Sequence, residues 1–122
     1  MPKSHGQRQS VRQERKAAED LGGRRTPASG ATPHIKGDVQ ARGLKVECKT
    51  TSGLSYSLKR RELEKAQMEA LTEGAMDWAM QVEFHLSPGF NRRYAVIDWM
   101  TYLDLRLRSA ELEDLKRRSE NG

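Results

Sequence analysis

The stretch Gly37–Lys49, with the sequence GDVQARGLKVECK, decides the fold because it predicts a hairpin with a defined pairing. If Arg42-Gly43 forms a two-residue turn at its centre, Asp38 on the first strand lies directly opposite Glu47 on the second. Side chains alternate along a strand, and directly opposed residues point to the same side of the sheet. We therefore expect Asp38, Glu47 and Lys49 to converge on one face, whereas a one-residue slip would move one acid to the other face.

Two carboxylates that face each other repel, so a fold that keeps them is expected to hold a cation between them. Their oxygen atoms suit Mg²⁺ or Mn²⁺. The ammonium of Lys49 can offset the charge of a phosphate or position an attacking water. The pattern therefore indicates metal-assisted hydrolysis of a phosphodiester. An exposed hairpin face with an ordinary Glu–Lys pair is the alternative, and the spacing alone leaves it open.

The composition predicts one small domain with an uneven distribution of charge. The chain has 122 residues, of which 35% are hydrophobic and 32% are charged, so we expect either a polar tail or pairing with a second copy. Residues 1–61 hold 14 Lys and Arg against 5 Asp and Glu, and residues 62–122 hold 8 against 12. The acid pair thus lies in the basic half. This fits a polyanionic substrate such as DNA or RNA, although a basic tail with a solvated surface explains the same asymmetry.

The sequence shows no second metal motif and no targeting segment. Cys48 is the only cysteine, so no disulfide framework is expected, and it should behave as a small core residue. The histidines His5, His34 and His85 form no zinc spacing with it. No apolar run is long enough to span a membrane, and the basic N-terminus lacks the apolar stretch of a signal peptide. We expect an intracellular, soluble protein.

Hydrophobic periodicity and turn residues predict a mixed α/β (α+β) domain around a central sheet. The predicted order is helix, strand, strand, helix, strand, strand, helix, over residues 9–21, 37–41, 44–50, 57–74, 78–85, 93–97 and 98–115. The expected N-caps of the helices are Ser10, Ser57 and Asp98. Residues 24–36 read as a loop because Pro and Gly punctuate them. The expected domain organisation is a flexible basic arm, a single domain and a charged tail, over residues 1–8, 9–115 and 116–122.

One acid lies on the predicted inner face of the first helix. Glu14 follows Val11 by three residues and precedes Ala18 by four, so it shares their stripe together with Leu21. An acid on a buried face needs a partner or a function. The alternative is a short exposed helix on which Glu14 pairs with a neighbouring basic side chain.

Two groups of basic residues are candidates for phosphate contacts. Lys59-Arg60-Arg61 at the start of the second helix opposes the helix dipole, and a bound phosphate would relieve that conflict. Arg24, Arg25 and Lys36 flank a loop of small residues whose amides can approach a phosphate backbone. A solvated surface triplet and an ordinary connecting loop are the respective alternatives.

Taken together, these pieces resemble the PD-(D/E)xK nuclease superfamily, and within it the small Holliday-junction resolvases of archaea and phages. The motif of that superfamily, an acid on one strand and Glu-x-Lys on the next, matches Asp38 and Glu47-Cys48-Lys49. Gly37 stands where a proline is usual in the motif. The resolvases also carry a glutamate in the first helix and a Ser/Gly-rich loop before the first strand, and Glu14 and Ala28–Ala31 take these places.

This resemblance, which covers about residues 10–100, implies a restriction-endonuclease-like mixed sheet flanked by helices. The implied ligands of Mg²⁺, for which Mn²⁺ can substitute, are Glu14, Asp38, Glu47 and the main-chain carbonyl of Cys48. The resemblance also implies that Lys49 orients or activates the attacking water. The implied DNA contacts are Arg24, Arg25, Ser29, Lys36, Lys59, Arg60 and Arg61.

The implied activity is metal-dependent cleavage of four-way junction DNA by a homodimer, with no organic cofactor and no membrane. Such an enzyme acts in the cytoplasm, which is the host cytoplasm if a phage encodes it. The exposed apolar residues of the second hairpin and the last helix are candidates for the dimer interface. Two alternatives stay open: another DNA repair or restriction-type nuclease of the same superfamily, and a non-catalytic nucleic-acid-binding module.

Overall fold

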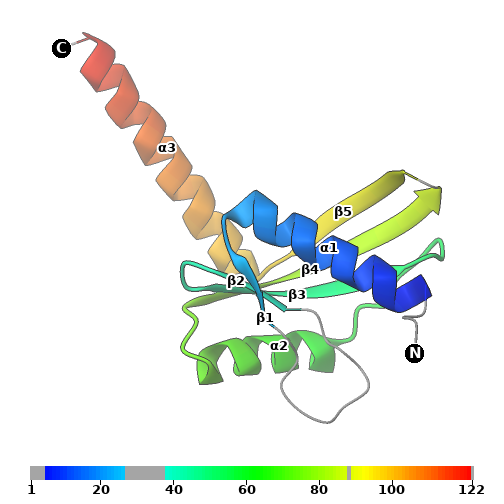
Figure 1. Ribbon diagram of the computed structural model, residues 1–122. Helices are drawn as coiled ribbons and strands as arrows, with labels where there is room; N and C mark the ends of the chain where they lie inside the picture. The colour runs from blue at the N-terminus through cyan, green and yellow to red at the C-terminus, as the bar shows by residue number, and fades with distance from the viewer. Residues whose placement is uncertain (1–4, 27–37, 88, 122) are drawn as a thin grey trace.

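The computed structural model describes residues 5–26, 38–87 and 89–121 (Figure 1). These residues form a five-stranded sheet with three helices. In chain order the elements are α1 (His5–Leu21), β1 (Arg24–Thr26), β2 (Asp38–Ala41), β3 (Leu44–Thr51), α2 (Arg60–Thr72), β4 (Asp77–Ser87), β5 (Phe90–Val96) and α3 (Trp99–Asn121). The predicted mixed sheet flanked by helices is confirmed, although the element order differs because β1 precedes the predicted hairpin.

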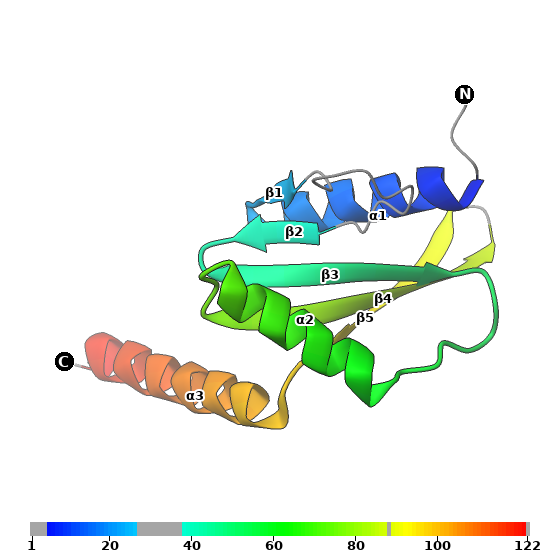
Figure 2. The same ribbon diagram turned by 90° about the horizontal axis from the view of Figure 1, so that it is seen from below.

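The strands lie in the order β1-β2-β3-β4-β5. The pairs β1–β2, β2–β3 and β4–β5 are antiparallel, and β3–β4 is parallel. A parallel pair needs a long crossover, and α2 supplies it. Figure 2 shows α1 on one face of the sheet and α2 on the other. The domain therefore has three layers, with the predicted hairpin at the centre of the middle layer.

The hairpin β2–β3 has the predicted register. Asp38 pairs with Glu47, and Ala41 pairs with Leu44. The turn residues Arg42 and Gly43 have φ angles of 45° and 81°. Positive φ at both central positions is what the two-residue turns favoured in hairpins require, because their twist matches that of the strands. Glycine takes such angles without strain, so the turn chemistry fixes which side chains face each other.

Several predicted boundaries were wrong. The strand β1 (Arg24–Thr26) lies in the predicted loop, because pairing with β2 outweighs a sequence without strand alternation. Helix α1 begins at His5, so residues 5–8 are not an arm, and Ser10 lies inside the helix. Helix α2 begins three residues after the predicted cap Ser57. Helix α3 runs through the predicted tail, where Asp114 and Arg118 form an i,i+4 ion pair.

Small side chains let α1 lie close to the sheet. Ala17 and Ala18 pack against Val39, Val46 and Ala79, which lie on the sheet face toward α1. Leu44, Cys48 and Ile97 border this cluster. Val11 and Leu21 were expected beside Ala18 on the inner stripe, but Leu21 is 40% exposed and Val11 lines a surface hollow. Gln13 and Glu14 are buried in their place.

Helix α2 also packs on the sheet through small side chains. Ala66 and Ala70 are the buried residues of α2. They belong to the layer that covers Met80 and Val82 on the opposite side of β4 from Ala79. By strand alternation this α2 face also carries the even-numbered side chains of β2 and the odd-numbered side chains of β3.

Helix α3 differs from the other two helices because none of its described residues is buried. Asp98 caps it, since its Oδ1 accepts a hydrogen bond of 2.9 Å from the backbone N–H of Met100. The helix extends away from the sheet in both views (Figures 1 and 2). None of the helices in the described ranges is long and apolar enough to cross a membrane.

Candidate metal and nucleic-acid site

The two predicted acids meet on the α2 face of the sheet. Asp38 is the first described residue of β2 and lies directly opposite Glu47 of β3. Glu47 is buried, and Asp38 is partly buried. Lys49 follows two residues later on the same strand and therefore points to the same side. The predicted convergence of Asp38, Glu47 and Lys49 thus rests on a confirmed register.

Each acid has a lysine of its own. The Nζ atom of Lys45 lies 3.4 Å from Oδ2 of Asp38 and 2.8 Å from Oε1 of Glu73 on α2. The Nζ atom of Lys49 lies 3.2 Å from Oε1 of Glu47. These ammonium groups offset the repulsion between the opposed carboxylates, so an external cation is not required to keep the two acids together.

Asp38 nevertheless keeps an unused ligand atom. Its Oδ1 is buried and has no hydrogen-bond partner in the described part of the chain, whereas Oδ2 faces Lys45. Burial raises the pKa of the Asp38 carboxyl, and the Glu47 charge adds to that rise while Lys45 opposes it. An incompletely neutralised carboxylate with a free oxygen is a suitable ligand for a hard divalent cation.

Lys49 is held in its charged form. Burial by itself lowers the pKa of this ammonium, but the charge and hydrogen bond of Glu47 outweigh burial and the pKa ends above its ordinary value. Lys49 is therefore a proton-bearing cation and a hydrogen-bond donor at neutral pH. It can stabilise negative charge on a phosphate oxygen, but it cannot act as a base there.

The structure does not bring Glu14 to the acid pair. Its Oε2 accepts a hydrogen bond of 2.9 Å from Nε of Arg25 and forms an ion pair of 2.9 Å with Nη2 of the same residue. Arg25 pairs with Val39, so both point to the α1 face, away from Asp38. The described residues contain no group of three or more His, Cys, Asp or Glu side chains that could hold a metal ion. The buried position of Glu14 is confirmed, but its partner is a basic side chain and not the acid pair.

The side chain of Cys48 points to the opposite face of the sheet from the acid pair. Its side chain borders the core cluster on the α1 side, as predicted. Burial, followed by the charges of Glu14 and Asp38, raises the pKa of the thiol to about 12. The thiol is therefore neutral and is neither a nucleophile nor a metal ligand at neutral pH. Only the main-chain carbonyl of Cys48 remains as the predicted ligand.

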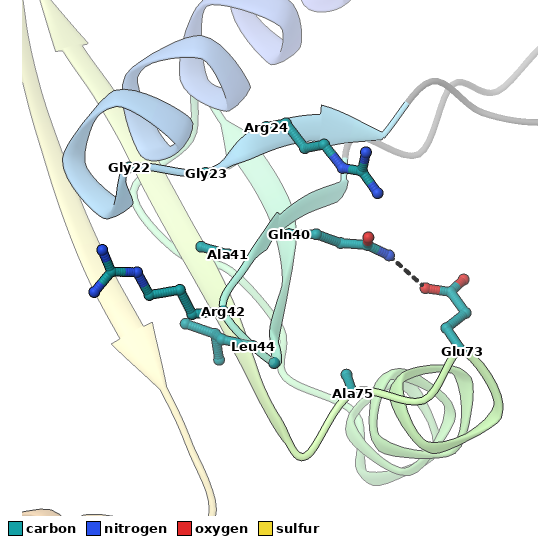
Figure 3. A pocket seen from close by; sticks show the side chains of 10 residues that line it. Gly22, Gly23, Arg24, Gln40, Ala41, Arg42, Leu44, Glu73 and Ala75 are labelled. Carbon is teal, nitrogen blue, oxygen red and sulfur yellow. Dashed lines mark hydrogen bonds between the residues drawn. The ribbon is translucent and has the colours of Figure 1, made fainter.

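The predicted DNA contacts are spread over several places. Arg24 lines a hollow of about 430 Å³ beside the hairpin turn, together with Arg42, Gln40 and Glu73 (Figure 3). Gln40 donates a hydrogen bond of 3.0 Å to Glu73 there, which closes the hollow against the end of α2. Arg24 pairs with Gln40 and points to the α2 face, whereas the side chain of Arg42 points to the other side of the turn (Figure 3).

The remaining contacts differ in their freedom to bind DNA. Arg25 is already committed to Glu14. Lys59, Arg60 and Arg61 are exposed around the start of α2, and Arg60 pairs with Glu64 at 3.0 Å. Ser29 and Lys36 lie outside the described residues. The first turn of α2 therefore remains the clearest predicted phosphate contact.

Sequence reasoning gave Lys45 no role in the site and missed its partners on α2. Lys45 lies two residues before Glu47, so strand alternation already placed it on the same face, but Glu69 and Glu73 become its neighbours only through the crossover of α2. Tyr56 was also missed; its hydroxyl donates a hydrogen bond of 3.4 Å to Glu62. The Lys45 contacts tie α2 to the charged face of the hairpin, and the Tyr56 contact ties the segment before α2 to its first turn.

Comparison of the chain with protein-family models, with curated proteins and with solved structures returns no match. The function of the chain therefore has to be inferred from the geometry of the sheet and of its charged face.

Proposed function

We propose that this chain is a divalent-metal-dependent DNA endonuclease of the PD-(D/E)xK type. In this proposal Asp38, Glu47 and the main-chain carbonyl of Cys48 hold Mg²⁺ or Mn²⁺. The observation that carries it is the register of the hairpin, because Asp38 lies opposite Glu47 and Lys49 shares their face. The unused Oδ1 of Asp38 supports the same assignment.

The chain's own groups would divide the chemistry between them. A divalent metal, when bound, supplies a Lewis acid that polarises the scissile phosphate and an attacking water. Lys49, kept charged by Glu47, would donate a hydrogen bond to a phosphate oxygen and stabilise the charge that develops on it. The water oxygen bonds to phosphorus as the bond to the leaving sugar oxygen breaks, which gives a phosphate monoester and a free hydroxyl group.

The proposed substrate is branched DNA, and the four-way junction is the branched structure that we favour. Support comes from the cations on the α2 side, beside the hairpin and at the start of α2. They are Arg24, Lys59, Arg60 and Arg61. Contacts of this kind position a duplex without reading its sequence. A junction enzyme cuts two strands, so we also propose that the chain works as a homodimer.

A non-catalytic nucleic-acid-binding module is the second candidate, and one observation favours it. Lys45 and Lys49 already pair with the two acids. In a purely structural ion-pair network of this kind, the carboxylates would have no further role. Metal binding and cleavage therefore have to be measured separately from DNA binding.

The test is cleavage of a four-way junction, linear duplex, single strands and flaps in the presence of Mg²⁺ or Mn²⁺. Asp38→Asn and Lys49→Ala are expected to abolish cleavage and to leave junction binding nearly unchanged. Lys116→Ala on the exposed helix α3 is the matched control for Lys49 and should cut like the wild type. If all substrates are cut equally, the proposal that the enzyme prefers four-way junctions is wrong. If no DNA is cut in the presence of either metal, the non-catalytic binding module is the remaining candidate function.

A further inference from the structure

A second polar site lies on the opposite face of the sheet from the acid pair. Helix α1 and the β4–β5 hairpin border an open cavity of about 680 Å³. Arg12 and Lys16 line it from α1, and Glu83, His85 and Arg93 line it from the hairpin. The volume lies within the range of about 300–1,000 Å³ that is usual for small-ligand sites. The proposed metal site uses none of these residues.

The wall of the cavity is cationic. Lys16 and Arg93 both bind Asp20, at 3.3 Å and 2.6 Å. Arg12 is exposed and makes no hydrogen bond or ion pair with any residue in the described ranges. Asp20 thus offsets part of the charge of Lys16 and Arg93, and Arg12 keeps its full charge. Arg8 and Arg15 extend the exposed positive charge along the outer side of α1.

The floor of the cavity carries buried polar atoms that lack partners. Glu83 is 5% exposed, and its Oε2 has no hydrogen-bond partner within the described residues. His85 bonds through Nε2 to the hydroxyl of Thr50, while its buried Nδ1 is without a partner in the same part of the chain. Nε2 of His85 lies 3.9 Å from Oε2 of Glu83, beyond hydrogen-bond distance.

Buried polar groups are normally hydrogen-bonded, and a buried carboxylate without a donor is costly. A ligand that forms hydrogen bonds with these buried atoms must present N–H donors to the carboxylate of Glu83 and a polar group to the imidazole of His85. A ligand that binds the cationic side chains of the wall must carry negative charge. A nucleotide combines both, because its base has ring and amino nitrogens and its phosphate is anionic.

We propose that this cavity binds one nucleotide of a single-stranded nucleic acid, with the phosphate on Arg12 and Lys16 and the base edge on Glu83 and His85. The adjoining phosphates would follow Arg8 and Arg15 along α1. Glu83 accepts hydrogen bonds, so bases with an exocyclic amino group bind better than thymine, which has none. The site needs no metal and is independent of the proposed nuclease centre.

The test is fluorescence anisotropy of labelled homopolymers of about ten nucleotides, a length within the usual site sizes of single-strand binders. The full chain is used in EDTA, and dC and dT oligomers are compared. Wild type is expected to prefer dC. Arg12→Ala should weaken binding about five- to tenfold and lower the salt slope by about one. Arg108→Ala, an arginine on the exposed helix α3, is the matched control and should bind like the wild type.

Glu83→Gln should bind dC and dT alike, because the amide no longer offers two acceptor oxygens. If the circular dichroism spectrum shows that this variant is unfolded, the Arg12→Ala variant still tests the proposal, because the exposed Arg12 can be replaced without disturbing the fold. Binding that ignores Arg12, or a wild type that does not distinguish dC from dT, would overturn the proposal. If free dCMP displaces the labelled oligomer, the site binds free nucleotides. If binding depends on Arg12 and dCMP does not displace the oligomer, the site binds a nucleic-acid strand. Asp38→Asn should leave all these affinities unchanged, which separates this site from the nuclease proposal.

Discussion

Asp38 lies partly buried between the ammonium of Lys45 and the carboxylate of Glu47. Burial raises its pKa, and Lys45 does not cancel that effect. A carboxyl group with a raised folded-state pKa contributes its full stability below the unfolded-state pKa, about 3.9. That contribution is lost as the pH rises through the folded-state pKa. In the absence of metal, ionised Asp38 therefore lowers the stability of the fold at neutral pH.

Asp38→Asn is accordingly expected to raise the thermal unfolding midpoint at neutral pH in EDTA, and the difference should close as the pH falls toward the unfolded-state pKa. Mg²⁺ should raise the midpoint of the wild type through binding to the folded state, and should leave that of Asp38→Asn unchanged. Asp77→Asn, at an exposed aspartate, serves as control. A variant that Mg²⁺ still stabilises would contradict the assignment of Asp38 as a ligand.

Glu14 illustrates how one residue can be placed correctly and its role revised. Its side chain is only 2% exposed and pairs with Arg25, which is one-third exposed. Breaking a buried ion pair strands a charge at a cost of about 3–5 kcal/mol, and the partial exposure of Arg25 reduces that to about 2 kcal/mol. We expect Glu14→Gln to lose about this much unfolding free energy in urea while calorimetry shows unchanged Mg²⁺ affinity. A fall in Mg²⁺ affinity would instead return Glu14 to the metal site.

At the scale of elements, the connection between α1 and β1 leaves the least space for a side chain among the described glycines. A Cβ atom on Gly23 would lie 2.3 Å from the carbonyl oxygen of Gln40, so only glycine fits there. Gly22 has a φ of 64° but open space around it. Gly23→Ala is therefore expected to cost about 1–3 kcal/mol by overpacking, and Gly22→Ala about 1 kcal/mol by backbone strain. Equal unfolding free energies for the two variants would show that β2 gives way to the added methyl group.

The elements also show what the sequence could predict. The hairpin and its acid pair were predictable because turn chemistry and strand alternation are local rules, and they also place Lys45 on the charged face. Strand β1 was not predictable, since its three residues gain their strand structure from hydrogen bonds to β2. The buried face of α1 was misjudged because Gln13 takes a core position by donating to the carbonyls of Lys49 and Gln81. Periodicity counts apolar side chains and cannot detect such long-range polar partners.

At the scale of the whole molecule, the sheet separates two polar sites of different kind. Figure 1 shows α1 and α2 on opposite sides of the sheet. The acid pair and its lysines lie on the α2 side, whereas the proposed nucleotide cavity lies on the α1 side. Cys48 and Val46 fill the space behind the hairpin on the α1 side. The two sites share no side chain, because the acid pair lies on β2 and β3 whereas the cavity is bordered by α1 and the β4–β5 hairpin.

Helix α3 has no described residue that is buried, whereas most helices in proteins gain their stability by packing an apolar face. Trp99, Leu103 and Leu107 follow each other at four-residue spacing and are 67%, 37% and 65% exposed, so they form an apolar stripe without a cover. An antiparallel pair of these helices centred on Leu103 would set Trp99 of one chain opposite Leu107 of the other, so that the two stripes cover each other. We therefore propose that the dimer pairs through α3.

Light scattering after size exclusion is expected to give twice the chain mass of 13.9 kDa. Leu107→Glu should shift the mass to the monomer, because it places a charge in the apolar stripe, and it should reduce helicity as α3 loses its partner. Ser109→Glu adds the same charge on another side of the helix and should remain dimeric. The sheet should survive in the monomer, since no residue of α3 is buried against it. A wild type that is monomeric at micromolar concentration, or a Leu107→Glu variant that stays dimeric, would exclude α3 as the interface.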